Sequence, residues 1–242
     1  MIIGISGKKQ SGKTTSGNFI LSLVMANTDI SQSIDIDDQG RIVVSDLLGD
    51  KNYEGIFDTQ SLHKNDYIIQ KVLDKLNPLI KLYSFADILK KEICIKLLGL
   101  TYEQCYGSDE DKNTMTDVLD PFVLKPMNAR DVMQYVGTDL FRKMKPNVWV
   151  DATLNQIQED KPKIAIITDC RFPNEVDSIK NKGGKIIRLT RDLYNSNHIS
   201  EKILDQDNYD WSNFDYIIHN EEMSIYDQCI DIQNILKEVI IL

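Results

Sequence analysis

Apolar and polar residues alternate along this chain in blocks that predict strands and helices in turn. Five apolar runs are compact enough to be buried strands: residues 2–6, 81–85, 164–168, 185–190 and 216–218. Apolar residues at helical spacing predict helices over residues 13–25, 86–98, 129–144, 148–158, 176–181 and 224–239. Strands that alternate with helices in this way are typical of a parallel α/β sheet, here with about five strands.

Residues 28–66 interrupt this alternation. Two short strands at residues 34–36 and 42–44 flank a polar turn in which Gly40 supplies the bend, so we predict a hairpin inserted beside the core. The rest of the insertion has little pattern. Residues 101–126 are polar and acidic, and we predict a loop with some helix there.

The 242 residues are 42% hydrophobic and 27% charged, which excludes a wholly disordered or fibrous chain. Twenty-eight basic against 37 acidic residues give a net charge of −9, so neither a nucleic acid nor an anionic membrane surface is expected as a partner. No stretch approaches the roughly 18 apolar residues of a membrane span. If the chain binds phosphate, its positive groups and N–H donors must be concentrated locally.

The four cysteines, Cys94, Cys105, Cys170 and Cys229, lie far apart and form no Cys-x-x-Cys pair. This spacing favours reduced thiols that pack in the interior over a disulfide scaffold or a zinc site. The apolar run at the N-terminus has no basic segment before it and no cleavage site after it, so we expect no signal peptide. Both observations favour a cytoplasmic protein.

Residues 7–14, Gly-Lys-Lys-Gln-Ser-Gly-Lys-Thr, fit the phosphate-binding pattern G-x-x-x-x-G-K-[ST] at every fixed position. The glycines let the backbone curl so that successive N–H groups face inward, and the helix predicted from Lys13 adds its N-terminal dipole. Lys13 can reach the β- and γ-phosphates, and the Thr14 hydroxyl is placed to bind Mg²⁺. We therefore expect ATP or another purine nucleotide with Mg²⁺. The residues expected to hold it are Gly7, Lys8, Gln10, Ser11, Gly12, Lys13, Thr14 and Thr15.

A second segment of chemical interest follows the strand predicted at residues 164–168. Ligands of parallel α/β sheets bind beyond the carboxyl ends of the strands, where this strand delivers Asp169 and Arg171. An acid in this position can hold Mg²⁺, and the arginine can bind phosphate in a bidentate fashion. Alternatively, Asp169 caps the helix that begins near Pro173. Given the phosphate-binding pattern at residues 7–14, we favour the metal role.

Two further segments are candidates for binding an acceptor nucleotide. Asp87 follows the strand predicted at residues 81–85 and lies at the same edge of the sheet, although it equally fits the first turn of a helix. On the helix predicted at residues 129–144, four polar residues at steps of four share one stripe: Arg130, Gln134, Thr138 and Arg142. An amide can pair with a base edge and guanidinium groups suit phosphate, but such a stripe is more often a solvated face.

These residues together resemble those of the phage-type deoxynucleoside monophosphate kinases. The matching blocks are residues 7–14, 83–87, 130–140 with Trp149, 168–175, 198–201 and 215–220. The resemblance implies a three-layer P-loop kinase fold with a parallel core sheet, in a single domain of residues 1–242. Within that domain it implies an inserted hairpin region (28–70), a helical acceptor-binding region (86–150) and a lid (188–210).

The resemblance also implies a reaction: transfer of the γ-phosphoryl group of ATP to a deoxynucleoside 5′-monophosphate, with Mg²⁺ held by Thr14 and Asp169. The residues implied as catalytic are Lys13, Arg130, Arg142, Arg171 and Arg191. The residues implied to bind the acceptor are Phe85, Asp87, Arg130, Gln134, Thr138, Asp139 and Arg171. A homodimer is consistent with the resemblance.

Two other functions fit the phosphate-binding pattern. One is another small-molecule P-loop kinase, and the other is a nucleotide-binding regulatory ATPase that signals by its shape. A GTPase would need an Asn-Lys-x-Asp segment after a strand, and none follows the predicted strands near Thr190 or Asn220. Turnover measured with different acceptors discriminates among these functions.

Overall fold

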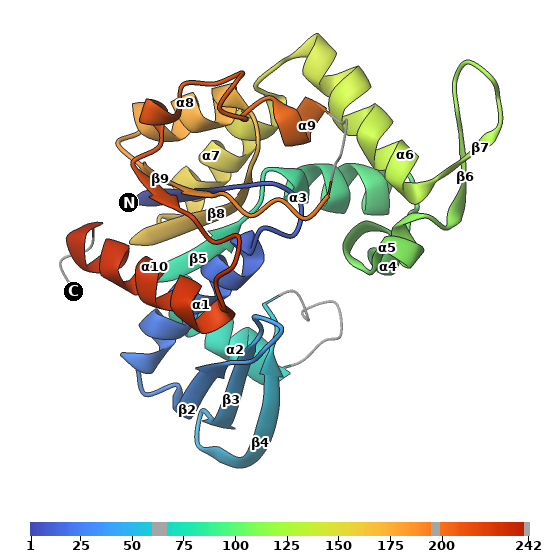
Figure 1. The fold of residues 1–242 in the computed structure, drawn as a ribbon. Helices are drawn as coiled ribbons and strands as arrows, with labels where there is room; N and C mark the ends of the chain where they lie inside the picture. The colour runs from blue at the N-terminus through green and yellow to red at the C-terminus, as the bar shows by residue number, and fades with distance from the viewer. Residues whose placement is uncertain (60–66, 195–198, 240–242) are drawn as a thin grey trace. The chain divides into compact units, whose positions relative to one another are not determined.

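The computed structural model of this protein describes residues 1–59, 67–194 and 199–239. The chain divides into two compact units, one made of residues 1–83 and 157–242 and the other of residues 84–156. Figure 1 shows how strands and helices follow one another within each unit. Within the described ranges, no helix combines the length and the hydropathy that crossing a bilayer requires.

The first unit is built on a five-stranded sheet in which every neighbouring pair of strands is parallel. The strand order is β10 (Tyr216–Ile218), β9 (Lys185–Leu189), β1 (Ile2–Ser6), β8 (Ile164–Cys170) and β5 (Ile80–Tyr83). The predicted parallel sheet of about five strands is therefore confirmed. β8 runs two residues further than predicted, because it stays paired with β1 up to its last residue.

Helices cover both faces of this sheet. α1 (Lys13–Ala26) and α10 (Ile225–Val239) share one hydrophobic cluster with the side chains of β1, β9 and β10. α8 (Pro173–Asn181) packs on the other face, where a Cβ at Gly4 would lie 2.7 Å from Ile179 Cδ1. The missing side chain at Gly4 lets α8 approach the sheet closely. Helix, sheet and helix form the three layers that the family resemblance implies.

The insertion in the first unit is a three-stranded antiparallel sheet of β2 (Ser31–Ile36), β3 (Ile42–Leu47) and β4 (Asp50–Phe57). The predicted hairpin corresponds to β2 and β3 and is confirmed, but the sequence pattern missed β4. Charged residues and a glycine interrupt the apolar alternation of β4, and the turn before it uses Leu48 and Gly49 at positive φ. α2 (Tyr67–Leu76) also lies where no element is predicted.

The second unit is mostly helical. Its elements are α3 (Ala86–Ile88), the π-helix η2 (Leu89–Leu97), α4 (Tyr102–Tyr106), α5 (Asp109–Lys112), β6 (Met115–Leu119), β7 (Pro126–Asn128), α6 (Ala129–Gln134), the π-helix η3 (Tyr135–Arg142) and the first part of α7 (Val148–Asp160). One prediction is wrong in detail here, because residues 115–128 form a hairpin where a loop with some helix is predicted. The helices predicted at 86–98 and 129–144 are confirmed, and they are π-helical over much of their length.

The remaining elements of the first unit are short. α9 (Ile199–Lys202) lies in the predicted lid, and the 3-10 helix η4 (Trp211–Asn213) precedes β10. The four cysteines are all buried and none forms a disulfide, in agreement with the prediction of packed, reduced thiols.

Candidate active site

The phosphate-binding loop, residues 7–14, joins β1 to α1, which is the strand–loop–helix context that its pattern requires. Gly12 has a φ of 97°, in the left-handed region that favours glycine, and a Cβ there would come within 2.7 Å of the Gln228 amide. α1 begins at Lys13, and the first N–H groups of a helix have no acceptor within it. The loop therefore presents N–H groups and the positive end of a helix dipole to an anion.

Lys13 is held inside this loop with 7% of its surface exposed. Its Nζ donates a 2.8 Å hydrogen bond to the Gly7 carbonyl and another to the Lys8 carbonyl. Burial, and then the positive charge of Arg171, lowers the pKa of Lys13 from 10.5 to about 7. A phosphate bound in the loop would supply the negative charge that keeps this ammonium protonated.

The other loop residues differ in where their side chains lie. Thr14 is exposed in the first turn of α1, whereas Thr15 lies against Gly40 in the turn between β2 and β3. Ser11 Oγ is buried and has no hydrogen-bond partner among the described residues. A buried hydroxyl without a partner costs free energy, and a phosphate oxygen in the loop would be a suitable partner for it.

The carboxyl end of β8 lies beside the start of the loop, because Cys170 pairs with Ser6 of β1. Asp169 and Arg171 flank this cysteine. The charges of both act on the pKa of Lys13, which Asp169 raises and Arg171 lowers. The structure therefore brings Lys13, Asp169 and Arg171 together, as the sequence analysis predicts.

Glu175 is a residue of this site that the sequence analysis missed. It is 1% exposed, and its Oε2 accepts hydrogen bonds from the N–H groups of Arg171 (2.6 Å) and Phe172 (3.0 Å). The carboxylate thus closes the turn between β8 and α8 and fixes the backbone of Arg171. Because Asp169 lies inside β8, the alternative that it caps α8 is wrong. The signal in the sequence for Glu175 is a proline at the first position of α8 with a glutamate two residues later.

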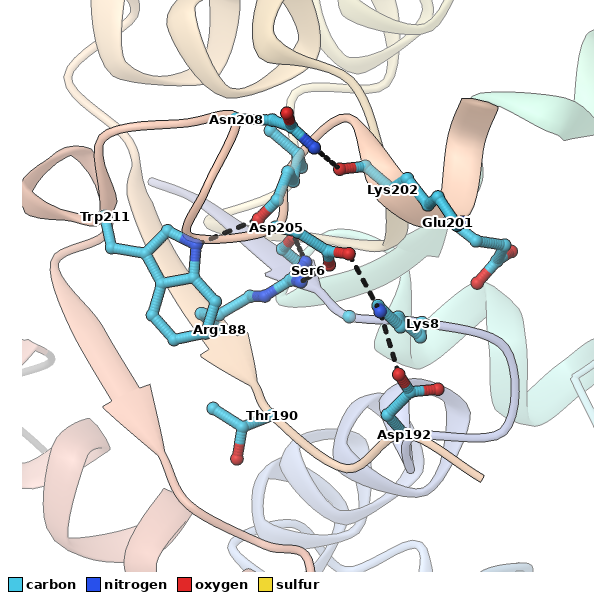
Figure 2. A network of polar contacts seen from close by, with 12 residues as sticks. Ser6, Lys8, Arg188, Thr190, Asp192, Glu201, Lys202, Asp205, Asn208 and Trp211 are labelled. Atoms are coloured by element: carbon cyan, nitrogen blue, oxygen red, sulfur yellow. Dashed lines mark hydrogen bonds and ion pairs between the residues drawn. The ribbon is translucent and has the colours of Figure 1, made fainter. Parts of the chain in front are cut away.

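The predicted lid meets the loop through its carboxylates (Figure 2). Glu201 of α9 accepts a 2.7 Å hydrogen bond from the Lys9 N–H and pairs with the Arg171 guanidinium. A carboxylate oxygen on a loop N–H occupies a position that suits a phosphate oxygen. His198, in the same predicted lid, lies outside the described residues.

Lys8 and Gln10 make the remaining contacts with the lid. Lys8 Nζ lies 2.8 Å from Asp192 Oδ2 and 3.0 Å from Asp205 Oδ2 (Figure 2). The Tyr194 hydroxyl donates to Gln10 Oε1 at 2.5 Å. Three side chains on the lid therefore hold the first half of the loop, in addition to Glu201.

The two arginines at the start of the lid have different surroundings. Arg188 is 4% exposed, donates a 3.0 Å hydrogen bond from Nη1 to Ser6 Oγ, and stacks over the Trp211 ring. Arg191 Nε donates to the Asn220 carbonyl at 2.9 Å and Nη2 donates to the Met223 carbonyl at 2.5 Å. In this structure Arg191 thus fastens the turn after β10, and its catalytic role stays a prediction.

Apart from Arg171, the residues predicted to bind an acceptor lie in the second unit. Phe85 is 2% exposed. Asp87 accepts 2.9 Å hydrogen bonds from the Tyr106 hydroxyl and from Lys91 Nζ. Burial and the negative charge of Asp87 raise the pKa of Tyr106. Asp87 therefore has a structural task inside this unit, and its binding role stays a prediction.

The predicted polar stripe is divided between α6 and η3. Arg130 in α6 donates from Nη2 to Asp109 at 2.9 Å and from Nε to Asn113 at 3.1 Å. The remaining predicted residues are exposed or half-buried: Gln134, Thr138, Asp139 and Arg142. Because a π-helix places more residues in each turn than an α-helix, steps of four do not keep these side chains in one straight stripe. Their roles at an acceptor or at the reacting phosphates stay predictions.

The donors for a metal ion are few in this site. Within the described ranges, no three His, Cys, Asp or Glu side chains gather into a metal cluster. Mg²⁺ usually keeps several waters and binds one or two protein oxygens together with substrate phosphates. The Thr14 hydroxyl and the Asp169 carboxylate next to a phosphate loop fit that kind of ion.

The fold and the loop together define a class. A parallel sheet with a phosphate loop after its central strand, and an acid near the carboxyl end of the neighbouring strand, is the arrangement of a P-loop kinase fold. The profile of the family described as deoxynucleotide monophosphate kinase matches residues 1–228. The chain therefore belongs to the deoxynucleotide monophosphate kinase family, an enzyme family, and the resemblance seen in its motifs is confirmed.

Two viral proteins are similar to parts of this chain. The provisionally named deoxynucleotide monophosphate kinase of Acanthamoeba polyphaga mimivirus is 36% identical over 132 residues, which cover 50% of this chain and 64% of the relative. The deoxynucleoside-5′-monophosphate kinase of Escherichia phage T5 is 35% identical over 68 residues, which cover 28% of this chain and 24% of the relative. The chain thus spans less than two thirds of the length of each relative.

Proposed function

We propose that this chain transfers the γ-phosphoryl group of ATP to the 5′-phosphate of a deoxynucleoside monophosphate, giving ADP and the deoxynucleoside diphosphate. Membership of the deoxynucleotide monophosphate kinase family supports this reaction class. The observation that carries the proposal is the arrangement of three side chains at the phosphate loop. Buried Lys13 lies beside the end of β8, where the charges of Asp169 and Arg171 act on it.

The proposed chemistry needs positioning and charge rather than a covalent intermediate. An acceptor phosphate oxygen attacks the γ-phosphorus of ATP, the bond to the β–γ bridging oxygen breaks, and that oxygen leaves with ADP. Lys13 and the loop N–H groups bind the β- and γ-phosphates, and Arg171 faces the group in transfer. Mg²⁺ bound by Thr14 and Asp169 would neutralise charge on the β- and γ-oxygens.

We place the acceptor-binding region in residues 86–150, the lid in residues 188–210 and an inserted region in residues 28–70 of one kinase domain. The acceptor side chains proposed are Phe85, Asp87, Arg130, Gln134, Thr138, Asp139 and Arg171, with Arg130, Arg142 and Arg191 at the phosphates. Two π-helices in the acceptor region support it, because such helices are rare and are frequent at functional sites. A reducing cytoplasm, that of the host for a phage-encoded chain, is the proposed location, supported by the absence of a disulfide among the four cysteines.

The proposal is tested by a coupled assay that detects ADP, with ATP, Mg²⁺ and each of the four common deoxynucleoside monophosphates. We expect ADP release that depends on at least one of these acceptors, together with formation of its diphosphate. ADP release that needs no acceptor would indicate a regulatory ATPase. Turnover only with an unrelated acceptor would indicate another small-molecule kinase, and either outcome contradicts the proposal.

Replacing Asp169 tests the metal role. Asp169→Asn keeps the size of the side chain but removes its negative charge, which is the property that holds a hard cation. We expect the Mg²⁺ concentration for half-maximal activity to rise about tenfold or more at fixed ATP. Asp177→Asn, an exposed change on α8, is the matched control. An unchanged Mg²⁺ requirement in Asp169→Asn would remove this residue from the metal site.

Replacing Glu201 tests whether the lid competes with the donor. Its carboxylate accepts from the Lys9 N–H, and its charge repels a triphosphate that enters the loop. Glu201→Gln retains an acceptor for this N–H without the charge. We expect the KM for ATP to fall roughly three- to tenfold. Measuring KM for ATP at saturating acceptor gives the answer, and a raised KM would mean that Glu201 assists donor binding instead.

A further inference from the structure

We infer that Asn220 is a positioning residue that fixes both the phosphate-binding loop and the base of the lid, an inference that rests on the proposed function. Asn220 directly follows His219 beyond the end of β10 and is 0% exposed. It carries no charge and does not belong to the phosphate-binding pattern of residues 7–14. Its importance comes from the contacts of its side-chain amide.

All four hydrogen-bonding positions of this amide are used. Asn220 Nδ2 donates to the Ser11 carbonyl at 2.8 Å and to Gln228 Oε1 at 2.7 Å. Asn220 Oδ1 accepts from the N–H groups of Thr190 at 3.1 Å and Arg191 at 2.8 Å. Because an amide has two N–H donors and one oxygen with two lone pairs, this set satisfies it completely and fixes its orientation. One buried side chain therefore joins the loop, α10 and the chain just after β9.

Gln228 of α10 extends the same network to the next loop residue. It is 1% exposed, and its Nε2 donates to the Gly12 carbonyl at 3.1 Å and to Ser16 Oγ at 2.9 Å. Asn220 and Gln228 thus donate hydrogen bonds to two consecutive carbonyls of the loop, those of Ser11 and Gly12. A carbonyl fixed outward turns the neighbouring peptide N–H groups toward the interior of the loop, where an anion would lie.

The first half of the loop is held in a different way. Lys13 Nζ binds the carbonyls of Gly7 and Lys8, but a bound triphosphate would draw this ammonium to its own oxygens. The amides of Asn220 and Gln228 are uncharged, so a bound triphosphate does not draw them away from the loop carbonyls. They are therefore the contacts that keep the loop in shape both before and after the donor binds.

The same amide also sets where the lid begins. Thr190 and Arg191 are the first residues after β9, and their N–H groups both end on Asn220 Oδ1. Arg191 returns the contact through its guanidinium, which binds the Asn220 carbonyl at 2.9 Å. The Asn220 amide consequently fixes both the loop and the base of the lid. Loss of this amide should weaken donor binding and leave acceptor binding unaffected.

The experiment compares Asn220→Ala and Asn220→Asp with the wild-type protein. Donor affinity is the Kd of a non-hydrolysable ATP analogue with Mg²⁺, measured by calorimetry, and the KM of donor and acceptor are measured separately. Asn220→Ala leaves the Ser11 carbonyl and the Arg191 N–H without these partners, while the Thr190 N–H keeps the Ile218 carbonyl, so we expect donor Kd and KM to rise about tenfold or more. Asn220→Asp keeps the acceptor oxygen and loses the donor, and we expect a similar rise. The acceptor KM should stay within about twofold.

Asp215→Asn is the matched control. Asp215 lies just before the other end of β10 and accepts from the Ile186 N–H at 2.9 Å, so its change weakens the same strand away from the loop. We expect a lower Tm and an unchanged donor Kd. Equal weakening of donor binding in Asp215→Asn, or a lower Tm with unchanged donor Kd in Asn220→Ala, would overturn the inference.

Gln228→Ala covers the case in which the Asn220 variants do not fold. It keeps the Asn220–Ser11 contact and removes the hydrogen bonds of Gln228 with the Gly12 carbonyl, Ser16 Oγ and Asn220 Nδ2, so a smaller rise in donor Kd is expected. An unchanged donor Kd in this variant contradicts the inference. The binding measurement needs no acceptor: a wild-type protein that binds the analogue but phosphorylates no deoxynucleotide contradicts the proposed function alone. A wild-type protein that binds no analogue contradicts both.

Discussion

Lys13→Ala is expected to reduce kcat by about 10²–10³-fold or more while the protein stays folded. The ammonium is the one positive charge placed inside the phosphate loop by its motif, and it stabilises charge that develops on the group in transfer. We expect the fold to remain, because Lys13 Nζ binds two carbonyls of a loop and takes no part in the hydrophobic core. The measurement is kcat in the coupled assay, with Tm as the check on folding.

Lys182→Ala, an exposed change after α8, provides the control for loss of a lysine. It should leave kcat and both KM values unchanged. A Lys13→Ala protein that keeps a wild-type kcat would show that residues 7–14 do not bind the donor, and the proposed function would then lose the observation that carries it.

Arg171→Ala is expected to lower kcat by about 10²-fold or more, with a smaller effect on the KM for ATP. Arg171 directly follows β8, and Glu175 fixes its backbone N–H. The charge of its guanidinium lowers the pKa of Lys13. Arg171→Lys should recover only part of the rate, because lysine keeps the charge but cannot bind phosphate in a bidentate fashion. Single-turnover rates with saturating ATP and acceptor measure the effect directly.

Arg41→Ala is the control for this prediction, since Arg41 pairs locally with Asp37 in the β2–β3 turn. It should leave the rate unchanged. A wild-type rate in Arg171→Ala would mean that Arg171 has a purely structural role through its ion pair with Glu201. Another arginine would then have to stabilise the charge on the transferring phosphoryl group.

The elements around the loop were predictable because their signals are local. The first four residues of β1 and of β8 are unbroken apolar runs, as expected for strands covered on both faces, and residues 7–14 lie between a strand and a helix. Parallel strands that alternate with helices present their carboxyl ends at one edge of the sheet. For this reason the sequence alone places Lys13, Asp169 and Arg171 at the same edge.

Other elements have signals that are weak or depend on contacts distant in sequence. β4 contains charged residues and depends on pairing with β3, and the β6–β7 hairpin has mostly exposed side chains and a turn without a glycine. The π-helices η2 and η3 follow the same apolar pattern as α-helices, because the periodicity of a short segment hardly separates the two.

Two polar residues whose contacts the sequence analysis missed, Glu201 and Asn220, differ from Glu175 in having distant partners. Glu201 and Asn220 act on residues about 190 to 210 positions away, so no spacing in the sequence connects them to the loop. A buried asparagine or glutamate looks like any surface residue until its partners are known. Only the fold reveals that their side chains end on the backbone of residues 9 and 11.

The carboxylate of Glu201 on the Lys9 N–H has a consequence for selectivity among anions. An intramolecular group competes at a high effective concentration, so free orthophosphate or sulfate gains too few contacts to displace it. A triphosphate engages the whole loop at once and has more binding free energy with which to do so. A nucleotide-free loop whose Lys9 N–H is already bound by Glu201 would therefore bind a nucleotide in preference to the inorganic anions around it.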